Sequence, residues 1–113
     1  MKLSYVISTQ PTRFAAVSLA DAARFEATAA RLAELGYNGV ELAVRDPGSL
    51  DIQNVKKILA AHRLVVPALG TGQAYGEEGL SFTDPDASVR ERAIARIEEA
   101  RRHVDADFTR YEA

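Results

Sequence analysis

The chain has 113 residues, with 14 basic and 16 acidic side chains and a net charge of −2, so no basic excess exists to neutralise a nucleic-acid backbone. Hydrophobic residues make up 47% and charged residues 27%, values typical of one soluble globular domain, and the absence of cysteine excludes disulfides and thiolate zinc sites. Because no apolar run approaches the roughly 20 residues of a membrane span and residues 1–8 are too short for a signal peptide, we expect a cytoplasmic protein without a membrane or nucleic-acid partner.

The first strand–helix unit occupies residues 3–36. Residues 3–7 are short and apolar and predict a strand, which a polar loop follows. The stretch SLAD at residues 18–21 resembles a capping box with Asp21 in place of the usual Glu, and it predicts that a helix begins there. Behind it, apolar residues recur at helical spacing: Phe25, Ala29, Leu32 and Leu35. Gly36 is expected to end this helix in the left-handed conformation.

The second unit begins with an apolar, β-branched stretch at residues 39–44, which predicts another strand. The stretch DPG at residues 46–48 predicts a turn after it. Asp51 is placed to cap a second helix. The expected buried stripe of that helix consists of Ile52, Val55, Ile58 and Leu59.

The third unit begins with a strand predicted at residues 64–69, and a long glycine-rich loop follows at residues 70–83. Asp84 and Pro85 predict the start of a third helix, because proline is tolerated in the first turn. The expected buried stripe of this helix consists of Val89, Ala93, Ile97, Ala100 and Val104. Its opposite face carries several arginines among acidic residues, which is typical of a solvated face.

Three successive strand–helix units predict an α/β fold with a parallel sheet. The strands are nearly continuous apolar runs, which is typical of a parallel sheet covered on both faces. A closed (β/α)₈ barrel takes about 250 residues, so this chain could supply only its first part. We therefore expect the first part of a larger α/β fold over residues 1–104 and an unassigned tail over residues 105–113, in which no fourth strand is predicted.

Several stretches of the chain resemble one family when taken in order: MKLS at 1–4, VIST at 6–9, VELAVRDP at 40–47, GTGQAY at 70–75 and GLSFTDP at 79–85. Together they are similar to the N-terminal part of the sugar phosphate isomerase/epimerase family, which has the xylose-isomerase-like (β/α)₈ barrel. The resemblance covers about residues 1–102 and implies a partial TIM barrel over residues 1–104.

The resemblance implies an enzyme for a keto sugar or a keto sugar acid. In that family a divalent ion, Mn²⁺ or similar, polarises a carbonyl while two glutamates move a proton at the neighbouring carbon. The metal is held by Glu, Asp, His and Glu at strand ends in the second half of the barrel. None of these ligands has a counterpart in this chain, so we expect it to hold no metal and to be inactive alone.

Glu41 lies inside the second predicted strand, where an unpaired carboxylate is costly. If Val40 and Leu42 face the helices, Glu41 points toward the barrel interior, near the strand ends where barrel active sites lie. There its carboxylate could accept hydrogen bonds from sugar hydroxyls. The alternative is a structural ion pair with Arg45 or Arg13.

Three further side chains are candidates for binding the substrate. Arg45 could bind a carboxylate or phosphate with two hydrogen bonds, or it could be solvated beside the turn. In the glycine-rich loop, Gln73 could donate to a carbonyl or hydroxyl and Tyr75 could stack on a sugar face; the alternative is a surface loop. The loop resembles a dinucleotide fingerprint only superficially. Phe14 is a candidate lid residue or an aromatic side chain held on its own loop.

A different class of function stays open, that of a non-catalytic half-barrel. In this alternative the chain pairs with a second copy of itself or with a separate C-terminal half. A partial barrel leaves unpaired strand edges and an uncovered inner face, both of which favour association. We therefore expect oligomers or aggregation of the isolated chain.

Overall fold

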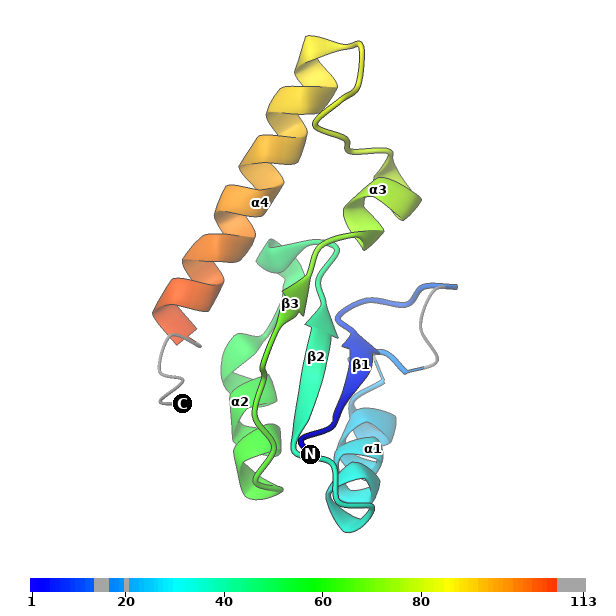
Figure 1. Cartoon of the computed structure of the whole chain (residues 1–113), viewed down its shortest axis with the longest axis vertical. Helices are drawn as coiled ribbons and strands as arrows, with labels where there is room; N and C mark the ends of the chain where they lie inside the picture. The colour runs from blue at the N-terminus through cyan, green and yellow to red at the C-terminus, as the bar shows by residue number, and fades with distance from the viewer. Residues whose placement is uncertain (14–16, 20, 108–113) are drawn as a thin grey trace.

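A parallel sheet of three strands organises the molecule (Figure 1). The computed structural model describes residues 1–13, 17–19 and 21–107. Strand β2 (Gly39–Ala43) lies in the middle, with β1 (Ser4–Ser8) on one side and β3 (Leu69–Gly70) on the other. Both pairings are parallel. The predicted α/β class with a parallel sheet is thereby confirmed.

Helices α1 (Ala22–Glu34) and α2 (Ile52–Ala61) connect the strands and pack on one face of the sheet. Val40 and Leu42 are wholly buried on that face, together with Ile7 of β1. They meet Phe25 of α1 and Leu59 of α2 in the main hydrophobic core. Each fully buried side chain of this size stabilises the fold by about 1.5–3 kcal/mol.

The opposite face of the sheet is not covered by a helix in the described part of the chain (Figure 1). Ser4 and Val6 of β1 are exposed there, and Val6 retains 46% of its accessible surface. The expectation of a sheet covered on both faces is therefore wrong for the described residues. Successive side chains of each strand instead point alternately toward the helices and toward the open face of the sheet.

The ends of the two crossover helices confirm most of the local predictions. Gly36 has a φ of +86°, the left-handed conformation expected after α1. The side chain of Asp51 accepts a hydrogen bond from the Asn54 amide and caps α2. The predicted start of the first helix is wrong, because Asp21 itself is the N-cap and accepts from the Arg24 amide. A single Asp cap of this kind suffices without the preceding serine.

The third predicted strand is shorter than expected, because it contains a bulge. Gly39 pairs with Val65 and Leu42 pairs with Leu69, so the segment that leads into β3 has one residue more than the facing segment of β2. Pro67 lies in this interval and has no N–H to offer the sheet. Gly39 permits the close approach, since a Cβ there would lie 2.7 Å from the Val65 carbonyl oxygen. Regular pairing therefore begins only at Leu69.

The predicted loop at residues 70–83 contains a short helix, α3 (Gln73–Glu78). Gly79 ends it with a φ of +70°. The sequence pattern does not predict this helix, because it has only six residues and begins after a glycine that cannot cap it with a side chain.

Helix α4 (Ala87–Asp107) extends beyond the expected boundary at residue 104, and residues 108–113 of the predicted tail lie outside the described residues. Its apolar stripe is only partly buried: Ala93 and Ala100 are buried, whereas Ile97 remains 36% exposed. The helix packs against the 3-10 turn η1 (Pro47–Ser49) and against α3. The expected stripe is therefore wrong at Ile97, because these neighbours cover only its small residues.

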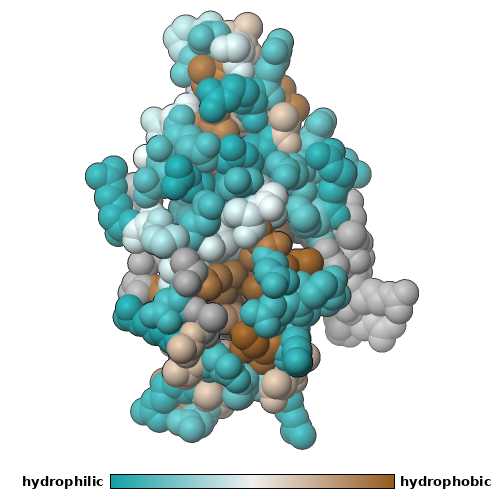
Figure 2. Space-filling model, turned by 180° about the vertical axis from the view of Figure 1, so that it is seen from behind, coloured by the Kyte–Doolittle hydropathy of each residue, from teal (hydrophilic) through white to brown (hydrophobic). Residues whose placement is uncertain are grey.

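The surface seen from behind shows apolar side chains gathered in the middle of the molecule and framed by hydrophilic ones (Figure 2). Among the residues that the structure describes, no helix combines the length and the apolar character needed to cross a membrane.

Candidate functional site

A cavity of about 320 Å³ lies on the open face of the sheet, beside the carboxyl ends of the strands. All three strands and helix α3 contribute to it. Its lining consists of Val6, Ala43, Gly70, Gly72, Gln73, Tyr75 and Gly76. Ligand sites of parallel α/β sheets lie at this end, because the loops that leave the strands converge there. The cavity therefore brings together two predicted site residues, Gln73 and Tyr75.

Glu41 lies at the edge of this cavity. It pairs in register with Val6, and its Oε1 lies 3.4 Å from the position that a Cβ on Gly70 would occupy. Its side chain is half-buried and has no hydrogen-bond or ion-pair partner in the described part of the chain. The predicted parity of this strand is confirmed, and of the alternative ion pairs, the one with Arg45 is wrong, because Arg45 pairs with Glu78. The carboxylate is available to accept hydrogen bonds from a ligand.

Gln73 is the first residue of α3 and retains only 8% of its accessible surface. Its Oε1 lies 3.0 Å from the hydroxyl of Ser8, which is wholly buried at the carboxyl end of β1. The same hydroxyl lies 2.5 Å from the carbonyl oxygen of Gln10. Ser8 thus fixes a side chain that lines the cavity, although the two residues are 65 positions apart.

Sequence reasoning missed Ser8, because it belongs to no catalytic motif. The signal that could have identified it is strand parity. Ser8 lies two residues after Val6, on the same face of β1, and pairs in register with Ala43 at the cavity.

Tyr75 lies at the rim of the cavity and is 67% exposed. It projects from helix α3 and not from an irregular loop, so its backbone is held by the hydrogen bonds of that helix. Tyr75 also lines a second cavity of about 250 Å³ between α3 and α4. An exposed aromatic ring beside a half-enclosed space is placed to stack on a sugar ring.

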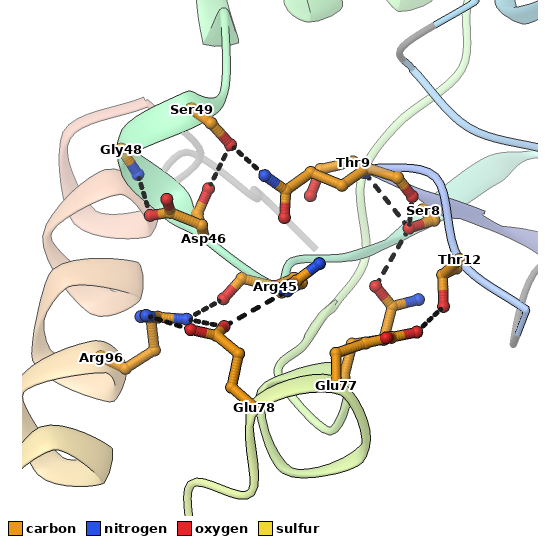
Figure 3. A network of polar contacts seen from close by, with 12 residues as sticks. Ser8, Thr9, Thr12, Arg45, Asp46, Gly48, Ser49, Glu77, Glu78 and Arg96 are labelled. Carbon is orange, nitrogen blue, oxygen red and sulfur yellow. Dashed lines mark hydrogen bonds and ion pairs between the residues drawn. The ribbon is translucent and has the colours of Figure 1, made fainter.

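Arg45 does not line the cavity, because it belongs to an ionic cluster with Glu78 and Arg96 (Figure 3). Arg96 donates two hydrogen bonds to the Glu78 carboxylate, at 2.6 and 3.1 Å, and a third to the Arg45 carbonyl oxygen at 2.6 Å. The Nε of Arg45 donates to Glu78 at 3.3 Å. Neither interpretation of Arg45, ligand binding or solvation, anticipated this partner.

The ionic cluster shifts the titration of its members. The hydrogen bonds from Arg96, and to a smaller extent the Arg45 guanidinium, hold the pKa of Glu78 below its ordinary value against an opposing effect of burial. The Glu78 carboxylate in turn raises the pKa of Arg96. Both groups are therefore charged at neutral pH, and the cluster joins α3, α4 and the end of β2.

A second polar contact holds α3 against the loop that follows β1. The hydroxyl of Thr12 donates to Glu77 at 2.8 Å (Figure 3). Together with the contact between Ser8 and Gln73, it fixes α3 over the carboxyl end of the sheet. The position of the cavity wall thus depends on side-chain hydrogen bonds as well as on the backbone.

A third cavity, of about 340 Å³, lies between the loop after β1 and helices α1 and α2. Phe25, Leu50 and Val55 contribute apolar walls, and Asp51 and Asn54 belong to the capped start of α2. The Oε1 atom of Gln10 is buried here without a hydrogen-bond partner, while its Nε2 donates to Ser49. None of the predicted site residues lines this cavity.

The described residues do not fit a metal site, because no three His, Asp or Glu side chains among them converge. Glu41 is a single carboxylate, and Glu78 is engaged by two guanidinium groups. Phe14, the candidate lid residue, lies outside the described residues.

No family model and no curated protein matches the chain.

Proposed function

We propose that this chain forms the substrate-binding wall of a sugar isomerase/epimerase barrel. The observation that carries the proposal is the cavity on the open sheet face, where Glu41, Gln73 and Tyr75 gather beside the carboxyl ends of three parallel strands. In this proposal the partial TIM barrel supplies binding groups, and a complementary C-terminal half supplies the divalent ion and the proton-transfer glutamates.

The side chains at the cavity have the chemistry that a sugar requires. A carboxylate and an amide hydrogen-bond to hydroxyl groups, and a tyrosine ring covers the apolar face of a sugar ring. The glycines at positions 70 and 72 leave room for the ligand beside the backbone. The volume of about 320 Å³ lies at the lower end of the range of small-molecule sites, roughly 300–1,000 Å³.

A titration of the ¹⁵N-labelled chain with D-fructose, followed by NMR, tests this proposal. We expect shifts at Gly70, Gly72 and Gln73, and weaker binding for the Tyr75→Ala variant. The matched control is Phe82→Ala, which removes an exposed ring that lines the cavity between α3 and α4 and not the cavity on the open sheet face. Shifts confined to the third cavity, or no shifts at millimolar sugar, would contradict the proposal.

An assay with Mn²⁺ tests the other part of the proposal. We expect no isomerisation or epimerisation of keto sugars or keto sugar acids by the chain alone. Metal-dependent turnover that co-purifies with the chain over successive chromatography steps would show that activity does not need a complementary half.

A non-catalytic pairing module is the second candidate function, and the open sheet face favours it. Val6 and Val65 are 46% and 50% exposed, and β1 and β3 are the outer strands of the three-stranded sheet. Light scattering after size-exclusion chromatography measures the mass in solution. A defined dimer that Val6→Lys dissociates favours this candidate, whereas a monomer with a cooperative melt contradicts it.

A further inference from the structure

The hydroxyl group of Ser8 has one proton and two neighbouring groups that could accept it. The carbonyl oxygen of Gln10 lies 2.5 Å away, and the Oε1 of the Gln73 side chain lies 3.0 Å away. The Gln10 amide also donates to this hydroxyl, at 3.3 Å. The position of the single proton therefore decides which end of the Gln73 amide can face Ser8.

The shorter of the two distances, the one to the Gln10 carbonyl oxygen, shows which group accepts the Ser8 proton. Two oxygen atoms 2.5 Å apart without a proton between them repel strongly, since hydrogen-bonded O–H···O pairs themselves lie at about 2.5–3.0 Å. The Ser8 hydroxyl must therefore donate to Gln10. The Gln73 Oε1, which faces this hydroxyl at 3.0 Å, is then a second acceptor without a proton, whereas a half-turn of the amide would bring its NH₂ to the hydroxyl as a donor. The oxygen and nitrogen ends of the amide are nearly isosteric, so hydrogen bonding selects the orientation.

In the orientation that satisfies Ser8, the Nε2 of Gln73 donates to the hydroxyl and the Oε1 is the free end. Gln73 has no other side-chain partner among the described residues, and it lines the cavity. Its free carbonyl is therefore available to a ligand as an acceptor. Ser8 is a positioning residue, which acts on the ligand only through Gln73.

The charged groups around the cavity point to the same ligand chemistry. Glu41 lies beside Gly70 with an unpaired carboxylate, and no cationic side chain is among the lining residues. The nearby cation Arg45 is engaged by Glu78. The side chains of this wall thus present a carboxylate and an amide carbonyl, both of which accept hydrogen bonds.

We infer that this wall binds the neutral, hydroxyl-bearing end of a polyol and disfavours a carboxylate or a phosphate. The inference rests on the proposed function and narrows it, because the anionic end of a keto sugar acid or a sugar phosphate would have to lie away from these three strands. Vicinal hydroxyls donate to two acceptors at once, whereas an anion meets the Glu41 carboxylate at close range.

The orientation of the Gln73 amide can be measured without any ligand. We expect nuclear Overhauser effects between the Nε2 protons of Gln73 and the β-protons of Ser8 in the unaltered chain. Their absence, while the backbone of Gln73 still shows contacts to β1, would overturn the assignment of the carbonyl to the cavity. This measurement needs no variant, so it holds even if Ser8→Ala fails to fold.

Ligand preference is measured with D-fructose and D-fructuronate, which differ only by oxidation of the terminal CH₂OH group to a carboxylate. We expect D-fructose to bind about tenfold more tightly, and Glu41→Gln to reduce that ratio severalfold by removing the like charge. Ser8→Ala should also reduce the ratio, because the amide of Gln73 can then rotate. Thr9→Val, which changes a neighbouring buried hydroxyl that contacts the Ala43 carbonyl, is the control and should leave the ratio unchanged.

The outcomes distinguish a wrong ligand preference from a wrong proposed function. Equal or tighter binding of D-fructuronate in the same cavity overturns the preference for a neutral group but leaves a sugar-binding wall. Absence of binding by both sugars overturns the proposed function, whatever the orientation of the amide.

Discussion

The two ends of this molecule are held together by different forces. The strands β1 and β2 with helices α1 and α2 enclose a hydrophobic core in which Ile7, Val40 and Leu42 are wholly buried. Among the described residues, the α3–α4 region has a smaller apolar cluster of Ala74, Leu80 and Ala93. It is also attached by the packing of α4 on η1, by the ionic cluster of Glu78, and by the hydrogen bonds between α3 and the hydroxyls of Ser8 and Thr12. The first region is therefore expected to unfold as one unit, whereas the second can loosen without it.

The difference bears on function, because the cavity lies between the two regions. Its floor, with Ala43 and Gly70, belongs to the sheet, whereas Gln73 and Tyr75 belong to α3. A ligand would thus bind between a rigid floor and a more weakly held wall. Binding is expected to raise the hydrogen-exchange protection of α3 more than that of β2.

Replacing a buried leucine by alanine in each region should give the largest difference in the free energy of unfolding. Leu42→Ala removes a wholly buried side chain from the central strand and should lower the free energy of unfolding by about 4 kcal/mol. Leu80→Ala, at a site of 6% exposure in the small cluster, should cost about 2 kcal/mol. Urea denaturation followed by circular dichroism measures both. Equal losses would show that the two regions unfold together.

The bulge at β3 gives a second contrast, between two glycines. Gly39→Ala would bring a Cβ to 2.7 Å from the Val65 carbonyl oxygen, and the resulting displacement should cost about 2 kcal/mol of unfolding free energy. Gly72→Ala meets no atom within 4 Å and should change stability by less than about 1 kcal/mol. Melting temperatures of the two variants compare them. A neutral Gly39→Ala would mean that β3 can move away from β2.

The ionic cluster is tested by Glu78→Gln, which keeps the shape of the side chain and removes its charge. We expect a loss of about 1–2 kcal/mol, because two guanidinium groups in a half-buried site lose their counter-charge. The loss should appear in the hydrogen exchange of Ala93 and not in that of Leu42. Glu91→Gln, at an exposed position of α4, is the control and should have no measurable effect.

Acid should act on the same contacts with a smaller effect. The pKa of Glu78 is lower in the folded chain than in the unfolded chain, so its stabilising contribution is present above the unfolded pKa and is lost as the pH falls through the folded pKa. The amide signals of α4 should therefore broaden or shift between neutral and strongly acidic pH before those of β2. In Glu78→Gln this acid response should be reduced; an unchanged response would assign it to other carboxylates, such as Asp86, whose pKa is lowered by hydrogen bonds from Ser88.

Local signals in the sequence were enough to predict much of the fold. Period-two alternation placed Val40 and Leu42 on one face of the sheet and Glu41 on the other. A glycine after a helix and an aspartate before one identified the end of α1 and the start of α2. These features depend on residues within four positions of each other, so a linear chain contains them completely.

The tertiary structure alone decided which side chains meet at the cavity. Ser8 contacts Gln73 across 65 positions, and Glu78 engages Arg45 and Arg96 although the chain offers many other charges. The choice among such partners depends on how the strand ends, the bulge at Pro67 and helix α3 approach one another in space. The strand–helix alternation and the face on which Glu41 lies therefore follow from the linear sequence. The pairing of Arg45 with Glu78 and the contact of Ser8 with Gln73 follow from the tertiary structure, because long-range packing selects one partner among several side chains of similar chemistry.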